Sequence, residues 1–211
     1  MKSVSKVKTA LAFVCVIVCL NACTQNGTGI FEGHGNIGNP ALTGNFVYDA
    51  STKTYTLSGG GINIWDTSDQ FFYAWKKVEG DFSMTTQLAF EGEGVNAHRK
   101  IGLMIREALT GESRYADIAI HGDGLTSLQY RAETGGITKE EVGPAGGNYI
   151  TLEKAGNKIR MRTATGVLPK DVTAEIEMDF TGEFYVGIFI CSHEAGVLET
   201  AYFSEVKFQS Q

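Results

Sequence analysis

The chain has 211 residues, of which 43% are hydrophobic, and a formal net charge of −6 at pH 7. That length fits one domain, which can be an all-β domain of the larger kind. The acidic balance argues against nucleic-acid binding and against an electrostatic hold on anionic lipid. With 26 glycines, 3 prolines and many Thr, Tyr, Phe, Val and Ile, the composition is typical of an antiparallel β protein with frequent turns.

The N-terminal segment has the features of a secretion signal. Three lysines precede an apolar run over Thr9–Leu20, which is too short to span a bilayer as a permanent helix. The run ends in Leu20-Asn21-Ala22-Cys23, which resembles a bacterial lipobox. We therefore expect a lipoprotein signal peptide over 1–22, a lipidated Cys23 and a short tether over 23–35. An uncleaved anchor and an ordinary signal peptide are the alternatives.

Each of these alternatives takes the body of the protein out of the cytoplasm, to the periplasm or the cell surface. Acyl chains on Cys23 would anchor it to a membrane, with each buried methylene contributing about 0.8 kcal/mol. Without residues 1–22 the net charge falls from −6 to −9, and Cys191 is the one cysteine left besides Cys23. We expect no disulfide and a buried, unreactive Cys191 thiol. No residues have metal-cluster spacing, and no cofactor is expected.

The remainder, residues 36–211, predicts an all-β domain. Roughly a dozen strands recur at spacings of about 8–12 residues from Asn45 onward, without a convincing helix. Gly33–Thr43 is expected to be a loop, Gln70–Lys77 a strand covered on both faces, and Glu183–His193 a central strand. A flat sheet of so many strands would leave a large apolar face and long edges in water. The sequence therefore predicts a two-sheet antiparallel β-sandwich or jelly roll.

The stretch Arg114–Ala132 predicts a β-hairpin around Gly122-Asp123-Gly124. A three-residue loop closed by a left-handed glycine pairs Asp117 with Gln129. A two-residue loop would mix apolar and polar residues on each face. The favoured register directs one set of side chains to the core (Ala116, Ile118, Ile120, Leu128, Tyr130) and another to the opposite face (Tyr115, Asp117, His121, Gln129, Arg131).

That polar face is either an ordinary solvated face or the floor of a binding groove. In the first case charges pair off, Asp117 with Arg131 and Arg106 with Glu107 or Glu133. In the second the face is shared with that of His98–Arg106, which also carries Lys100, and Trp65, Tyr73 or Trp75 supply a stacking platform. Aromatic and planar hydrogen-bonding groups suit sugar rings, and Arg suits carboxylate or sulfate. The candidate ligand-binding residues are Trp75, His98, Arg106, His121, Gln129 and Arg131.

Several segments together resemble a known superfamily. They are Trp65, QFFYAWKKVEGDF (70–82), HRKIGLMIRE (98–107), HGDGLTSLQYR (121–131), YITLEKAGNKIRMR (149–162) and YVGIFICSHEAGVLETAYFSEVKF (185–208). The chain is similar over nearly all of 36–208 to concanavalin A-like β-sandwich proteins of Bacteroidetes, and to a broader family of unknown function. The resemblance implies a jelly roll of two curved sheets, whose concave face holds sugars in the wider superfamily. It implies no particular catalytic residue.

Three functions follow as hypotheses. The leading one is non-catalytic binding of a carbohydrate or related polar ligand on the concave face, and it expects Arg131→Ala to abolish binding at a nearly unchanged melting temperature. The second is a polysaccharide-degrading enzyme. A lyase would use Arg131 and Gln129 to neutralise a carboxylate, and His121 and Tyr115 for proton transfer.

A glycoside hydrolase would instead use two of the alternating acids Glu175, Glu177 and Asp179, for which a solvent-facing acidic strand is the favoured interpretation. The third hypothesis is a structural or assembly lipoprotein that binds a protein partner through a sheet face or edge. A flat, convex or occluded polar face would favour this third function.

Overall fold

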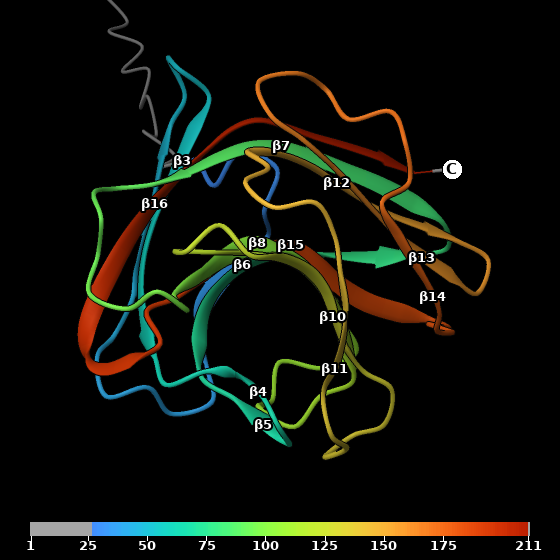
Figure 1. Cartoon of the computed structure of the whole chain (residues 1–211), viewed down its shortest axis with the longest axis horizontal. Coiled ribbons are helices and arrows are strands. Elements are labelled where there is room, and N and C mark those ends of the chain that lie inside the picture. The colour runs from blue at the N-terminus through green and yellow to red at the C-terminus, as the bar shows by residue number, and fades with distance from the viewer. Residues whose placement is uncertain (1–26, 211) are drawn as a thin grey trace, which may run out of the picture.

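The computed structural model describes residues 27–210 (Figure 1). Over this range the chain forms two seven-stranded sheets and a two-stranded hairpin, and no helix. The predicted all-β, two-sheet antiparallel fold is therefore confirmed. No helix within the described range is long and apolar enough to cross a membrane. The signal peptide and Cys23 lie outside the described residues, so their predicted roles stay predictions.

Sheet A, the strongly curled inner sheet in Figure 1, has the order β1-β6-β15-β8-β9-β10-β11. In that order its strands are Gly33–Ile37, Phe71–Glu79, Glu183–Cys191, Lys100–Arg106, Tyr115–His121, Thr126–Arg131 and Lys139–Val142. Sheet B has the order β14-β13-β12-β7-β16-β3-β2. Its strands are Ala174–Glu177, Lys158–Ala164, Tyr149–Ala155, Phe82–Phe90, Glu194–Ser210, Thr54–Gly61 and Asn45–Asp49. The hairpin consists of β4 (Ile64–Trp65) and β5 (Ser68–Asp69).

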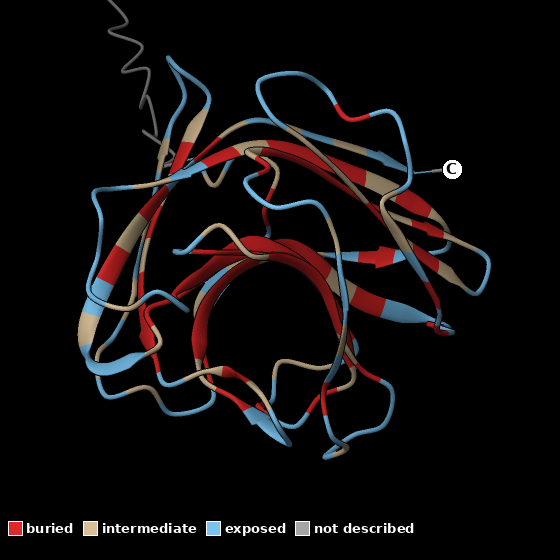
Figure 2. Ribbon diagram, viewed as in Figure 1, coloured by how far each residue is buried: buried red, intermediate tan, exposed pale blue. Residues whose placement is uncertain are grey.

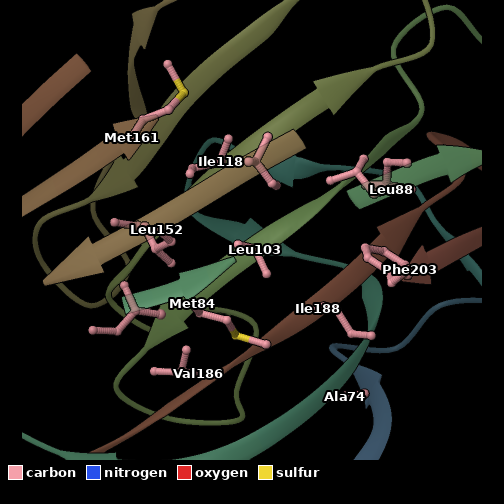
Figure 3. Packing of buried hydrophobic residues seen from close by; sticks show 14 of the residues in the cluster. Ala74, Met84, Leu88, Leu103, Ile118, Leu152, Met161, Val186, Ile188 and Phe203 are labelled. Atoms are coloured by element: carbon pink, nitrogen blue, oxygen red, sulfur yellow. The ribbon is translucent and has the colours of Figure 1, made fainter. Parts of the chain in front are cut away.

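The main core lies between the two sheets. Figure 3 shows side chains of both sheets interdigitating there, among them Leu103, Ile118 and Ile188 from sheet A and Met84, Leu152 and Phe203 from sheet B, all at most 3% exposed. Burial of each such side chain stabilises the fold by about 1.5–3 kcal/mol. Alternation along the strands supplies this core, as the sequence pattern predicts.

The predicted hairpin register is confirmed. Asp117 pairs with Gln129 and Tyr115 with Arg131, and the His121 N–H donates to the Leu125 carbonyl at 2.8 Å across the three-residue loop. The expected central strand is β15, between β6 and β8. Its Cys191 is a buried free thiol, and burial raises its pKa to about 11, which makes it a poor nucleophile.

The N-terminal boundary differs from the sequence-based expectation. The segment predicted as tether and loop contains strand β1, which pairs with β6, and Phe31 before it is 2% exposed in the main core. The pattern Gly33–Ile37 has one apolar side chain in five, so alternation gave no signal. Strand β1 is stabilised instead by its contacts with β6. The Trp75 ring of β6 packs so closely over Gly33 that a Cβ on Gly33 would lie 2.9 Å from the ring.

The concave face of sheet A is largely filled. Figure 1 shows β4–β5 lying across the open side of the curled sheet, and Figure 2 shows the sheet buried along most of its length. A second hydrophobic cluster occupies this face, with Ile64 from β4 packed among residues that include Phe71, Met104 and Phe189. The predicted groove therefore does not run the length of the face.

Two glycines permit the close strand approach in this curled sheet. A Cβ on Gly102 would lie 1.7 Å from the Ile118 carbonyl oxygen, and one on Gly187 would lie 1.8 Å from the Ala74 carbonyl oxygen. Any larger residue would therefore force neighbouring strands apart.

A buried ion cluster of Asp69, Arg106 and Arg131 lies beside the second hydrophobic cluster on the concave face of sheet A. All three side chains are 0% exposed. Arg131 grips the Asp69 carboxylate with two N–H donors, at 2.7 and 2.9 Å, and Arg106 lies at 3.3 Å. Arg131 also donates to the Trp65 and Gly136 carbonyls, at 3.1 and 3.0 Å. One guanidinium group thus ties the β4–β5 hairpin and the loop after β10 to sheet A.

This cluster corrects two sequence-based assignments. Arg106 and Arg131 do not face a groove, and their carboxylate partner is Asp69 rather than Glu107, Glu133 or Asp117. The physical reason is that a short hairpin, distant in sequence, folds over the sheet and brings a counter-ion that no spacing pattern indicates. Both arginines are therefore structural in this fold.

We expect Arg131→Ala to lower the free energy of unfolding by about 3–5 kcal/mol, because it leaves Asp69 as a buried charge that has lost its main partner. Urea denaturation at pH 7 measures this loss. Lys77→Ala is the control, since its ion pair with Glu183 is about half exposed on both sides and should contribute little. A melting temperature that Arg131→Ala leaves unchanged would contradict the structural role.

Candidate functional site

One end of the concave face remains open and forms a pocket of about 220 Å³. Residues of β8, β9, β10 and β11 line it, together with Trp65 of the β4–β5 hairpin. Polar and ionisable side chains dominate its lining, with one indole and one leucine. The lining residues are Asn63, Trp65, His98, Lys100, His121, Leu125, Gln129, Glu140 and His193.

Strand pairing explains why these side chains converge. Lys100 lies opposite His121 across β8 and β9, and Gln129 lies opposite Glu140 across β10 and β11. The row between them consists of small residues: Gly102 pairs with Ala119, which pairs with Ser127. Because side chains alternate with period 2, all of these residues share the concave face. The small row leaves a depression, with larger polar side chains on either side.

Several buried polar atoms around this depression have no hydrogen-bond partner among residues 27–210. They are both carboxylate oxygens of Asp117, His121 Nδ1, Ser127 Oγ and Gln129 Oε1. Each such group costs about 1–3 kcal/mol relative to a satisfied one. Burial also raises the pKa of Asp117 well above its usual range. Groups kept in a fold at such a cost mark a candidate binding or catalytic site.

Lys100 is the cation of the pocket. The side chain is 2% exposed and its ammonium group donates to Asn63 Oδ1. Among residues 27–210 no carboxylate oxygen lies within 4.0 Å of that ammonium. Burial lowers the pKa of Lys100.

Three histidines surround the mouth of the pocket. The ring centroid of His98 lies 6.0 Å from that of His121 and 5.6 Å from that of His193. Burial lowers the pKa of His121 to about 3 and also lowers that of His193, so both imidazoles are neutral at pH 7. Within the described residues no group of three His, Cys, Asp or Glu side chains is arranged to hold a metal ion.

Rigid supports hold the pocket walls. Trp65 belongs to the β4–β5 hairpin, whose carbonyl groups Arg131 binds. The loop that carries His98 is fastened by Arg99, which donates to the Glu199 carboxylate at 2.6 Å and to the Gly92 carbonyl at 2.6 Å. The pocket is therefore built on packed elements and does not depend on a free loop.

The structure brings together three of the six predicted ligand-binding residues: His98, His121 and Gln129. Arg106 and Arg131 lie in the buried ion cluster. Trp75 lies in β6, two strands from β8, where its ring stacks on Tyr73 at 5.7 Å and meets Tyr185 at 6.3 Å. These three do not line the pocket, because the filled part of the concave face separates them from it.

The sequence analysis assigned no binding role to Asn63, Leu125, Glu140 or His193. It predicted Lys100 on the polar face and Trp65 beside it, but neither was among the six candidate ligand-binding residues. Asn63 and His193 come from segments that flank other strands, and only the fold brings them to β8 and β9. Glu140 had a usable signal. It lies on strand Lys139–Val142, next after the hairpin, and extends the Asp117–Gln129 row to a third strand.

The structure bears on the two catalytic arrangements predicted from the sequence, the lyase quartet and the three acids of a glycoside hydrolase. The lyase quartet is not assembled on the pocket, because Tyr115 and Arg131 are 0% exposed and His121 and Gln129 face it without them. The acids Glu175, Glu177 and Asp179 are exposed at the β14 edge of sheet B, with Glu175 paired to Lys158 and Arg160. The interpretation of a solvent-facing acidic strand is therefore confirmed.

A second hollow, of about 280 Å³, lies on the outer face of sheet B. Its polar groups already have partners: Arg162 binds Glu153 at 3.1 Å, and the Thr85 and Thr151 hydroxyl groups are 2.8 Å apart. Because none of the buried, unpartnered polar atoms of residues 27–210 belongs to this hollow, the concave-face pocket is the stronger candidate site.

Comparisons with known proteins identify the fold. No protein-family model matches the chain, and no curated protein matches it. A functionally unknown protein from Saccharomyces cerevisiae aligns with 82% of this chain and 99% of its own, at a TM-score of 0.60 and 15% identity. A GH43 protein from Bacillus licheniformis aligns over 84% of this chain but 39% of its own, at a TM-score of 0.56 and 14% identity.

A β-glucanase from Bacillus licheniformis aligns with 89% of this chain and 92% of its own, at a TM-score of 0.50 and 13% identity. At such identities the similarity shows the fold alone. The chain thus shares a two-sheet antiparallel β-sandwich fold with these proteins, and its place in the concanavalin A-like superfamily stays what the sequence resemblance implies. The lipoprotein character and the Bacteroidetes type stay predictions.

The buried, neutral imidazole of His121 predicts acid sensitivity. Its pKa of about 3 in the folded state lies below the ordinary value of 6.5, so the unfolded chain takes up the proton first as pH falls. The stability from neutral His121 is present above pH 6.5 and is lost between pH 6.5 and 3. Between pH 7 and pH 4.5 this loss amounts to about 2 kcal/mol.

Urea denaturation of the wild type and of His121→Gln at these two pH values measures the effect. We expect the variant to lose about 2 kcal/mol less than the wild type between them. Equal losses in the two proteins would mean that solvent reaches the His121 imidazole in the folded state.

Proposed function

We propose that the protein binds a small carbohydrate, or a related polar ligand, in the open pocket of the concave face. The observation that carries this proposal is the group of buried polar atoms without partners beside the pocket, on Asp117, His121, Ser127 and Gln129. His121 and Gln129 line the pocket, so a ligand with several hydroxyl groups can form hydrogen bonds with them directly or through ordered water, whereas Asp117 and Ser127 are 0% exposed and do not line it. The proposal is for binding without catalysis.

The chemistry of the lining suits a sugar. Hydroxyl groups form hydrogen bonds with the planar side chains of Asn63, Gln129, Glu140 and the histidines, while the Trp65 ring offers an apolar face for the C–H groups of a sugar ring. Pockets with few, convergent polar groups and an aromatic wall are typical of small-molecule sites.

The size of the pocket limits the ligand. Pockets for drug-sized ligands range over about 300–1,000 Å³, and this one has about 220 Å³. The β4–β5 hairpin and the Asp69 cluster also close the continuation of the groove. We therefore propose that the ligand is a short saccharide or the end of a chain, and that an internal stretch of a polymer does not enter.

Two proteins that share the fold are described as a GH43 protein and a β-glucanase, and another as a pseudo β-1,3-glucanase of Mycobacterium tuberculosis. They support a carbohydrate-related role for this chain. The basic N-terminus, the apolar run and the lipobox-like Leu20-Asn21-Ala22-Cys23 support a lipid-anchored protein outside the cytoplasm. In this proposal the protein holds its ligand at the bacterial envelope.

A second candidate function is assembly through a protein partner. The observation that favours it is the occlusion of most of the concave face, which a polymer-binding groove would leave open. The open pocket with its unpartnered groups favours the small-ligand function, because a purely structural face would have them satisfied.

Gln129→Leu tests the proposal. Its Oε1 atom has no partner among residues 27–210 and its Nε2 atom lies 3.5 Å from His121 Nε2, so the variant should change the melting temperature little while losing a ligand contact. Calorimetric titration with a panel of neutral, uronic and sulfated mono- to tetrasaccharides should show roughly a 10-fold weaker affinity. Gln209→Leu, on the outer face of sheet B, is the control and should bind like the wild type.

Mass spectrometry of the same mixtures tests for catalysis. Unchanged saccharides are expected. New products that vanish in His121→Ala would make the protein an enzyme and overturn the non-catalytic proposal. A wild type that binds no saccharide of the panel would overturn the carbohydrate-binding function.

A further inference from the structure

The charges of the pocket point to its ligand. We infer that the ligand carries an anionic group, a carboxylate or a sulfate, that pairs with the ammonium group of Lys100. This inference rests on the proposed function and names the class of saccharide that the pocket takes: an acidic sugar.

The first observation is the state of Lys100. Its side chain is 2% exposed, and its hydrogen-bonding partner within the described residues is the amide oxygen of Asn63. No carboxylate oxygen of residues 27–210 lies within 4.0 Å of its ammonium group. A buried cation without a counter-ion is unfavourable, and proteins ordinarily pair such charges. Since Lys100 lines the pocket, a bound ligand can supply the missing anion.

The second observation is the balance of charge on the concave face. The buried cations are Lys100, Arg106 and Arg131, and the buried acids are Asp69 and Asp117. Asp69 forms ion pairs with both arginines. Asp117 has no hydrogen-bond partner for its carboxylate oxygens among residues 27–210, and burial raises its pKa well above the usual range. Neither buried acid of this face therefore forms an ion pair with Lys100.

The remaining titratable groups that face the pocket form no ion pair with Lys100 at 4.0 Å or less, although, against the lowering by burial, the Glu140 carboxylate raises the pKa of Lys100 through space. His121 and His193 add no negative charge in either protonation state. His98 lies at the exposed mouth, beside the Asp123 carboxylate at 4.0 Å. Glu140 is half-buried on the edge strand β11 and forms no ion pair with Lys100. It can accept hydrogen bonds from sugar hydroxyl groups while a ligand anion sits over Lys100.

The third observation is that the acceptor of the Lys100 hydrogen bond has a second donor. Asn63 Oδ1, the acceptor of the Lys100 bond, also accepts from the Ile64 backbone N–H at 2.9 Å. Removing the ammonium group would therefore leave no acceptor unsatisfied. An apolar side chain of similar length, such as Met, would fill the space without a buried charge. A buried charge without an ion-pair partner, placed at a pocket where its removal leaves no acceptor unsatisfied, fits a role in binding an anionic ligand.

The test compares methyl glycosides that differ only in the group at C6. Purified protein is titrated in a calorimeter with methyl glucoside, methyl glucuronide and methyl glucoside 6-sulfate, and with the same set in the galacto and manno configurations. Sodium acetate and sodium sulfate report binding of the anion without a sugar. We expect at least one acidic sugar to bind 10-fold or more tightly than its neutral counterpart, with a preference that weakens as salt is raised. The uronate and sulfate arms show which anion the pocket prefers.

Lys100→Met should reduce that preference to less than twofold and should not lower the melting temperature. Lys100→Arg, which keeps the positive charge, should retain a preference for the acidic sugar. The control is Lys77→Met, which removes a lysine that is exposed and paired with Glu183 at a distance from the pocket. It should bind like the wild type.

Neutral and acidic sugars that bind equally well would overturn this inference and leave the proposed function standing. Acetate or sulfate that binds as tightly as the acidic sugars would overturn the acidic-sugar class. No binding of any sugar would overturn the proposed function together with the inference. If Lys100→Met unfolds, the charge preference of the wild type alone decides, because that comparison needs no variant.

Discussion

The grip of Arg131 on Asp69 is the interaction on which the rest of the concave face depends. It joins the end of β10 to the β4–β5 hairpin, with both side chains 0% exposed and two N–H donors on one carboxylate. The same guanidinium group binds backbone carbonyls of the β4–β5 hairpin. A buried ion pair of this kind contributes less net stability than its short distances suggest, because both charges are desolvated. Its contribution is specificity: it fixes where the hairpin lies, and hence which part of the face is closed.

Closure of the central face defines what the open end can do. A jelly roll with an unobstructed concave sheet can accommodate a polymer along its length, whereas this chain keeps one pocket of about 220 Å³. The closed part contains satisfied charges and aromatic rings, while the open part contains Lys100 without a counter-ion and polar atoms without partners. Polar groups have partners in the closed part of the face and lack them near the open end, and this difference favours a small, polar ligand at the open end.

Local pattern sufficed for much of the fold. Alternation and turn chemistry predicted the hairpin of Asp117 and Gln129 in its correct register, and the apolar run around Cys191 predicted the central strand. The sequence could not show what covers a face. The polar face of Arg131 looked the same whether water, a ligand or another segment lay against it, and the answer came from Asp69, 62 residues away in the chain. For the same reason β1, which has little apolar pattern of its own, was expected to be a loop.

The most direct test uses the two tryptophans of the chain as reporters of the two halves of the face. Trp65 lines the pocket, and Trp75 packs against Tyr73 and Tyr185 in β6. In an NMR titration with the tightest saccharide of the panel, Trp65→Phe assigns the two indole N–H signals. The account predicts that the Trp65 signal and the His121 ring signals shift with saturation while Trp75 stays in place. A shift at Trp75 with none at Trp65 would contradict it.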